Sequence, residues 1–241
     1  MIYFFDGTED GFFTAFLRGF SDDDAILSST QTQLLLGEHS VFVPSSRVLA
    51  EKAKKRLTEF DSSFPHDFLL LFRNGRMDRD MIAFRYCRLL ALEKRPVRKM
   101  LAHVAAREAD DAIRQVAFEI HRFHGFIRFT ESASGALYAP FSPDHDICDL
   151  LVPHFKARLP EYPFVLHDVG RKKAAVYDGK NVFVAPLGRT DVVISADEAE
   201  WQALWKRYYA SVNIPERERL KQMRGYLPAR YWKFMPEKQE N

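Results

Sequence analysis

The sequence from residue 163 to residue 187 reads PFVLHDVGRKKAAVYDGKNVFVAPL. It contains three short runs rich in β-branched and aromatic residues, Phe164–His167, Ala174–Tyr177 and Val182–Ala185, a composition that is typical of β-strands. The pair Asp178-Gly179 separates the second run from the third, and Asp-Gly favours the tight turn of a β-hairpin. We therefore expect an antiparallel sheet at the centre of this half of the chain.

Further elements are predicted on both sides of this stretch. Upstream, residues 126–130 and 136–140 have the pattern of strands, and residues 143–159 have the pattern of a helix. Downstream, residues 197–212 form a predicted helix with one apolar face, which we expect to point into the core. The residues of that face are Trp201, Leu204, Trp205, Tyr208 and Val212.

The first half of the chain begins with a predicted strand over residues 2–5. The turn signal Asp6-Gly7 follows, and Thr8 is placed to cap a helix. Two further runs, Gln33–Leu36 and Ser40–Val43, have the pattern of a hairpin. Residues 44–123 are mainly helical by their apolar periodicity.

The order of these elements predicts an α+β fold with a mainly antiparallel sheet, a helical middle and a long C-terminal helix. We expect a single domain over residues 1–236, with a division into two subdomains near residue 124 as the alternative. Residues 237–241 are expected to form a frayed tail.

Composition excludes several classes of protein. The 241 residues are 46% hydrophobic and 14% aromatic with a formal net charge of +2, which excludes a globally disordered chain. No apolar run approaches the roughly 20 residues of a membrane span, and the N-terminus lacks the basic region of a signal peptide. A cytoplasmic location is therefore expected, without membrane association. The two cysteines, Cys87 and Cys148, are too far apart in the sequence for a CxxC motif.

Charge is concentrated near the C-terminus, where residues 205–233 hold eight basic and two acidic residues. Aromatic residues are interleaved with these cations, and nucleic-acid surfaces combine cations for phosphates with flat rings for bases. The same aromatic residues are also typical of the closing segment of a core. On the nucleic-acid interpretation, the contacts to phosphates and bases come from Lys206, Arg207, Arg217, Arg224, Tyr226, Arg230 and Tyr231.

A metal site is the alternative that the histidines suggest. His145-Asp146 and His167-Asp168 supply imidazole and carboxylate groups, which suit divalent transition metals. A metal-dependent hydrolase or base-processing enzyme with these four catalytic residues is thus a second hypothesis, although caps and turns explain the same residues. The chain contains no GxGxxG, GxSxG or GxxxxGKS/T motif, so no cofactor is expected.

Both ends of the chain resemble a bacterial family. The N-terminal motif is YFFDGTEDGFFTA over residues 3–15, and the C-terminal motifs are WKRYY (205–209), VNIPER (212–217) and LPARYW (227–232). Similar segments in the middle include RFTE over residues 128–131. The resemblance spans nearly the whole chain, and its C-terminal part is the more specific.

The family that these motifs resemble is a domain of unknown function assigned to DNA repair or DNA metabolism. Its members are typically encoded beside a radical S-adenosylmethionine (SAM) protein, and in some relatives a uracil-DNA glycosylase-like domain follows. The resemblance implies DNA and the radical SAM protein as partners, but it implies no catalytic residues. A third hypothesis is a protein-interaction adaptor that binds the radical SAM protein and not DNA.

Overall fold

The computed structural model describes residues 1–29, 39–188, 192–212, 214 and 219–239. The chain forms two compact units, Met1–Phe118 (unit 1) and Glu119–Asn241 (unit 2). Along the chain, the boundary between the two units falls within the helix α5, Val104–Phe126. The α+β class is confirmed, and about half of the chain is helical.

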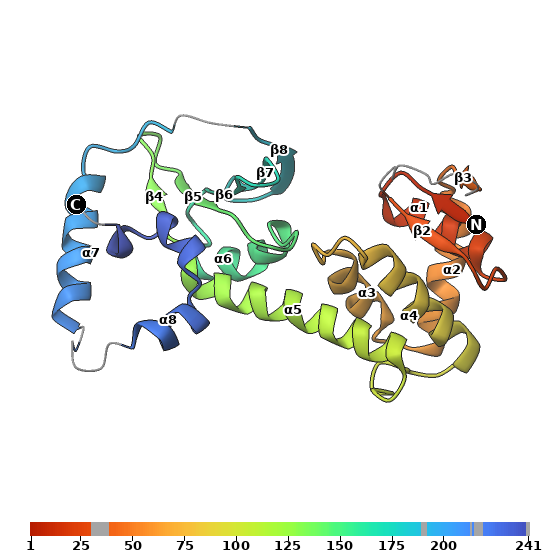
Figure 1. Ribbon diagram of the computed structural model, residues 1–241. Coiled ribbons are helices and arrows are strands. Elements are labelled where there is room, and N and C mark those ends of the chain that lie inside the picture. Colours follow the sequence, from red (N-terminus) through yellow and green to blue (C-terminus); the bar gives the residue numbers. More distant parts are fainter. Residues whose placement is uncertain (30–38, 189–191, 213, 215–218, 240–241) are drawn as a thin grey trace. The chain divides into compact units, whose positions relative to one another are not determined.

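Unit 1 contains a parallel three-stranded sheet, whereas a mainly antiparallel sheet was expected. The strands β1 (Ile2–Phe4), β2 (Ile26–Ser28) and β3 (Ser40–Phe42) lie in the order β2-β1-β3 (Figure 1). The helix α1, Glu9–Gly19, carries the chain from β1 to β2, and such a crossover is what a parallel pair requires. The predicted strand Gln33–Leu36 lies outside the described residues.

Helices form the rest of unit 1. They are α2 (Arg47–Phe60), α3 (Phe64–Phe72), α4 (Arg79–Glu93) and the first part of α5. Phenylalanine rings from α1 and α3 pack together at the centre of the core, where the tilted rings of Phe13 and Phe68 have centroids 4.6 Å apart. The predicted helical middle is therefore confirmed.

Unit 2 is built on a mixed five-stranded sheet in the order β4-β5-β6-β7-β8. The strands are β4 (Thr130–Glu131), β5 (Leu137–Phe141), β6 (Phe164–Asp168), β7 (Lys173–Tyr177) and β8 (Val182–Pro186). The pair β5–β6 is parallel, because the 3₁₀ turn η1 (Asp149–Leu151) and the helix α6 (Val152–Arg158) return the chain between them. The expected β6–β7–β8 meander is antiparallel, as predicted.

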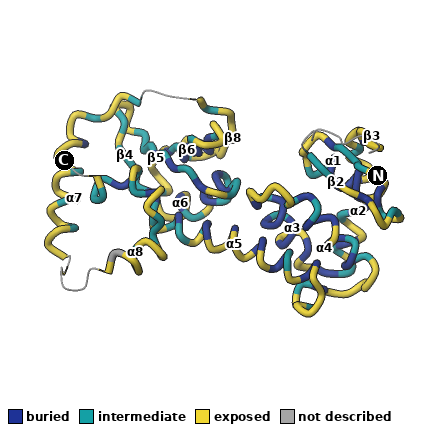
Figure 2. The backbone as a smooth tube through the Cα atoms, viewed as in Figure 1, coloured by how far each residue is buried: buried dark blue, intermediate teal, exposed yellow. Residues whose placement is uncertain are grey.

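The C-terminal helix is shorter and more exposed than expected. The helix α7, Glu198–Val212, has only 15 residues, and Figure 2 shows it exposed along most of its length. The apolar face that was expected to point into the core is largely open to solvent, with Trp201 60% exposed. The described residues thus leave most of this face uncovered.

The chain after α7 folds back onto unit 2. It forms α8 (Leu220–Tyr226) and the 3₁₀ turns η3 (Ala229–Phe234) and η4 (Pro236–Lys238). Within the expected tail, the Glu237 side chain is only 3% exposed and forms an ion pair with Arg128. Among the described residues, no helix combines the length and apolar character that a transmembrane segment needs.

Candidate nucleic-acid-binding site

The basic C-terminal segment contains exposed and buried residues. Arg207 on α7 and Arg224 on α8 are exposed, Lys206 is half-buried, and Tyr226 is 68% exposed. The Arg224 guanidinium also lies 5.8 Å from the centre of the Trp232 ring. Arg217 lies outside the described residues. These exposed groups remain available to a ligand.

Tyr231 is structural instead, and Arg230 is exposed but paired with a carboxylate. The Tyr231 side chain is buried, and its hydroxyl donates to the Glu119 carboxylate at 2.8 Å. Its ring packs 4.9 Å from the ring of Phe123, and the guanidinium of Arg230 forms an ion pair with Asp144. Tyr231 therefore closes the core of unit 2, and its ring is not open to stacking on a base.

His167 and Asp168 are buried in β6 and fully bonded. The Tyr138 hydroxyl lies 2.6 Å from Nδ1 of His167, and Nε2 lies 3.1 Å from the Leu187 carbonyl oxygen. Because a carbonyl can only accept, Nε2 carries the proton and Nδ1 accepts from the tyrosine. The Asp168 carboxylate accepts from both the backbone and the side chain of Arg171. Both residues stabilise the sheet.

His145 and Asp146 occupy the loop after β5. Lys173 forms an ion pair with Asp146 at 2.8 Å. The backbone N–H of His145 donates to Glu119 at 2.8 Å, and burial lowers the pKa of the imidazole. In the part of the chain that the structure describes, no three His, Cys, Asp or Glu side chains form a group that could hold a metal ion. The described geometry therefore does not assemble the four candidate residues into a metal centre.

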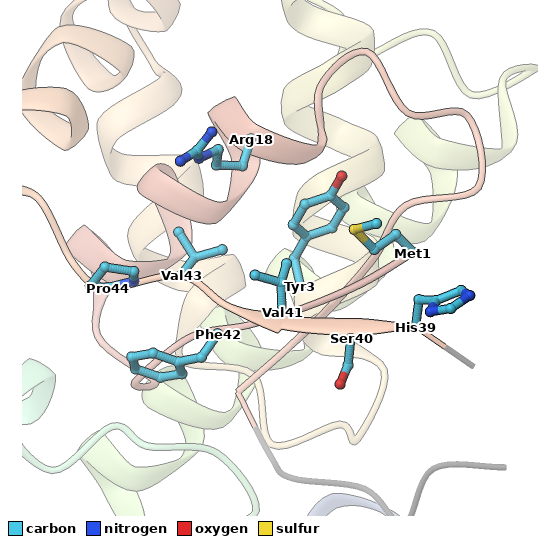
Figure 3. A pocket seen from close by; sticks show the side chains of 9 residues that line it. All are labelled: Met1, Tyr3, Arg18, His39, Ser40, Val41, Phe42, Val43 and Pro44. Atoms are coloured by element: carbon cyan, nitrogen blue, oxygen red, sulfur yellow. The ribbon is translucent and has the colours of Figure 1, made fainter. Parts of the chain in front are cut away.

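A shallow pocket of about 520 Å³ lies in unit 1 beside β3. Figure 3 shows Tyr3 and Val41 on the side of β3 that faces Arg18, while Phe42 extends to the other side. The Tyr3 hydroxyl donates to Asp22 at 3.2 Å. The lining combines apolar residues with the polar side chains of Arg18, His39 and Ser40, a mixture that specific ligand sites also have.

A second pocket, of about 630 Å³, lies in unit 2 and has that combination. We call it the aromatic pocket. Its lining comes from the end of α5, the segment before β4, β5, α6, α7 and η4. The side chains that give it chemical character are Arg128, Arg158, Glu198, Trp201, Gln202 and Trp205.

The helix α7 supplies four of these side chains. Glu198, Trp201, Gln202 and Trp205 are spaced at i, i+3, i+4 and i+7, so they share one face of the helix. Trp205 is held in place by Glu237, whose carboxylate accepts from its indole N–H at 3.0 Å. The result is an indole wall of defined orientation.

Hydrogen-bonding groups form another part of the lining. The Glu198 side chain is buried, and its carboxylate accepts from the Glu131 backbone N–H and from the Gln202 amide, both at 2.9 Å. A carboxylate has about four lone-pair positions, so two donors leave acceptor capacity on Glu198. The pocket therefore presents acceptors beside its aromatic wall.

The two arginines of the pocket differ in their availability. Arg128 donates to Glu237 at 2.7 Å and 3.1 Å, and its guanidinium lies 5.5 Å from the centre of the Trp205 ring. Arg158 at the end of α6 is exposed and makes no ion pair with the described residues. Arg158 is thus the cation that can meet an anionic ligand.

His124 lines the aromatic pocket and stacks on His154, with ring centroids 4.0 Å apart. Burial lowers the pKa of His124, and the neighbouring His154 and His121 lower it further. Protonation of His124 is therefore disfavoured at neutral pH, and its ring adds a flat, uncharged surface to the lining.

Sequence reasoning did not identify Glu198, Gln202 or Arg158 as site residues. The sequence pattern does indicate Glu198 and Gln202, because they stand at helical spacing from Trp201 and Trp205. The apolar face was expected to be covered by a core, so the polar side chains beside it were not considered. Nothing in the sequence marked Arg158, since only the structure places the end of α6 in the lining of the same pocket as α7.

Comparison with known proteins gives a family but no described relative. A family model described as a domain of unknown function (DUF4130) matches residues 77–237, about two thirds of the chain. No curated protein and no solved structure matches significantly.

Proposed function

The chain belongs to the DUF4130 family of unknown function, and we propose that it binds single-stranded nucleic acid through the C-terminal part of unit 2. The process we propose is DNA repair or DNA metabolism, in which the chain acts beside a radical SAM protein. The resemblance of both chain ends to a family assigned to that process supports this context. The physical proposal rests on unit 2 alone.

The observation that carries the proposal is the exposure of large aromatic rings among exposed cations. Trp201 and Tyr208 on α7 and Tyr226 on α8 are each more than half exposed. Aromatic residues of this size usually bury their rings, and contiguous exposed rings are typical of binding surfaces. Arg207 and Arg224 are exposed on the same two helices.

The two kinds of group have different places on α7. Successive residues of an α-helix are rotated by about 100°, so Arg207 lies about 120° around the helix from Trp201. A strand that contacts both must cross the helix, with its phosphates near Arg207 and its bases near the indole face. Such a path suits a flexible single strand, whose stacked bases and backbone can be bound separately.

The two other hypotheses have less support. Three of the four residues of the metal-dependent alternative already have partners: His167 bonds to Tyr138, Asp146 pairs with Lys173 and Asp168 pairs with Arg171. The adaptor alternative would place an acidic partner protein on the same cations, and it remains an outcome of the test below.

The test is fluorescence anisotropy with a labelled single strand of about twelve nucleotides, across a salt series. We expect binding whose affinity falls as a power of salt concentration. The double variant Arg207→Gln/Arg224→Gln should reduce the slope by roughly 1.4, because each phosphate contact on a single strand contributes about 0.7.

A matched control removes the same charge elsewhere. Arg47 and Lys55 are exposed on α2 in unit 1, and the variant Arg47→Gln/Lys55→Gln should keep the slope of the unsubstituted protein. Equal slopes for both double variants would refute the assignment of phosphates to Arg207 and Arg224. Failure to bind any strand at low salt would refute the proposed function and favour the adaptor.

A further inference from the structure

We propose that the aromatic pocket takes a single unpaired nucleobase from the bound strand, with a preference for guanine. This inference rests on the proposed function, because the strand is what delivers the base. It adds a base-recognition site that is separate from the cations of α7 and α8. Three properties of the pocket support it.

The first property is size and wall chemistry. A volume of about 630 Å³ falls within the range of roughly 300–1,000 Å³ that is usual for small-molecule sites. Trp201 and Trp205 line one part of the pocket, and Phe129 and Phe155 line another. Every base has a flat π-face, so aromatic walls favour insertion of a base over an aliphatic group.

The second property is that the indole of Trp205 is fixed before any ligand binds. Its N–H donates to Glu237, and the guanidinium of Arg128 lies over its ring. Arg128 is itself held by Glu237. A ring that is already oriented loses less conformational freedom on binding, which favours affinity.

The third property is the position of hydrogen-bond acceptors. Glu198 retains acceptor capacity, and the side-chain carbonyl of Gln202 is an acceptor beside it. Guanine offers two adjacent N–H donors on its Watson–Crick edge, whereas thymine and uracil offer one N–H flanked by two carbonyl oxygens. Two carbonyls facing a carboxylate are repelled, so the pocket should discriminate against thymine and uracil.

Arg158 completes the site at the end of α6. Its exposed guanidinium makes no ion pair within the described ranges, so it is open to the phosphate attached to the inserted base. Arg128 is not assigned this role, because Glu237 already neutralises it. A base and its phosphate would then contact two different elements, α7 and α6.

Intrinsic tryptophan fluorescence provides the first readout, since two of the three tryptophans line the pocket. We expect GMP to quench the emission at lower concentration than UMP. Trp201→Ala should weaken GMP binding by about 5- to 150-fold, the loss that removal of one stacking ring produces. Trp232→Phe changes a tryptophan outside the lining and should keep the affinity for GMP.

The second readout is anisotropy with two labelled oligothymidylates, one with a central guanosine and one with a central abasic site. The guanosine strand should bind more tightly, and Trp201→Ala should abolish the difference while the salt slope persists. Trp201 is exposed, so its removal leaves the core intact. Glu198→Gln, checked for folding by circular dichroism, should reduce the preference for GMP over UMP.

The outcomes separate the two proposals. Equal binding of the guanosine and abasic strands, with the salt slope intact, would overturn the pocket assignment and leave the proposed function standing. Equal quenching by GMP and UMP would overturn the guanine preference. GMP binding without any strand binding would overturn the proposed function and support the pocket as a nucleotide site.

Discussion

Arg128 and Glu237 are 109 positions apart in the sequence, yet they form an ion pair whose shorter N–O distance is 2.7 Å. The second oxygen of the same carboxylate accepts from the indole of Trp205. One buried carboxylate thus joins η4 to α7 and to the segment before β4. The orientation of the Trp205 indole in the aromatic pocket depends on these contacts of Glu237.

Glu237→Ala should therefore weaken unit 2 and the pocket together. The substitution removes charge-assisted hydrogen bonds, which contribute about 1.5–3 kcal/mol each before relaxation, so we expect the free energy of unfolding to fall by about 1–3 kcal/mol. Urea unfolding measures the loss. Glu161→Ala removes an exposed carboxylate from unit 2 and should leave stability unchanged, and equal effects of the two would contradict this role.

Acid should weaken the contacts that Glu237 makes with Arg128 and Trp205. Burial raises the pKa of Glu237, but hydrogen bonds from Arg128 and Trp205 outweigh it, so the folded-state pKa lies below the usual value. The group therefore contributes stability at pH values above its unfolded pKa of about 4.3, and this stability is lost as the pH falls through the folded value. Between pH 6 and pH 3 (roughly), Glu237→Gln should lose less stability than the unsubstituted protein. If the free energy of unfolding falls equally with pH in both proteins, another titrating group dominates the acid destabilisation.

Gly11→Ala should destabilise unit 1. The carboxylate of Asp6 accepts from Thr8 and Ser45, and its Oδ1 would lie 2.1 Å from a Cβ at position 11. Overpacking of this kind costs about 1–3 kcal/mol, although Asp6 can move at the expense of its hydrogen bonds. Thermal unfolding measures the change. Gly125→Ala, where a Cβ meets nothing within 4 Å, is the matched control.

Tyr231 and Tyr226 should respond in opposite ways. Tyr231→Phe deletes the buried hydroxyl that donates to Glu119, and we expect a loss of about 1–3 kcal/mol of stability. Tyr226→Ala removes an exposed ring and should leave stability nearly unchanged while it weakens strand binding. Chemical denaturation and anisotropy on both variants test the assignment, and weaker strand binding by a fully folded Tyr231→Phe would argue against a purely structural role.

The two cysteines should be inert in the folded protein. Cys87 and Cys148 are both fully buried, and burial raises the pKa of Cys148 to about 11. Since the thiolate is the reactive form, native protein at pH 8 should react with a thiol reagent only as fast as it unfolds. In denaturant, both thiols should react at once. Rapid reaction of one thiol in native conditions would reveal local opening.

Strong local signals predicted much of the fold. Residues 164–186 formed the expected three strands, because the apolar runs and the Asp178-Gly179 turn act over a few residues. The parallel pairings of β1 and of β5–β6 were not predicted. Such a pairing joins strands that are distant in the sequence, and no local pattern shows which strands pair. The strand β2 was missed as well, because three residues carry no clear period.

The candidate site was only partly predictable. Residues 205–233 were identified by charge, but a charge pattern does not distinguish Arg224 from Arg230, which is also exposed but forms an ion pair with Asp144. The apolar face of α7 was predicted correctly, but the prediction that this face points into the core was wrong. The period of a helix shows that a face is apolar, and only its neighbours decide whether that face is covered.

The contact between Tyr231 and Glu119 also bears on the order of events during protein synthesis. The two residues are separated by 112 positions, so at roughly 5–20 residues per second on the order of 10 s pass between their additions to the chain. Unit 1 has its whole core within its own 118 residues and can fold while translation continues. Unit 2 cannot close its core until the segment around Tyr231 has been synthesised. Until then, the strands of unit 2 lack the packing that this segment supplies.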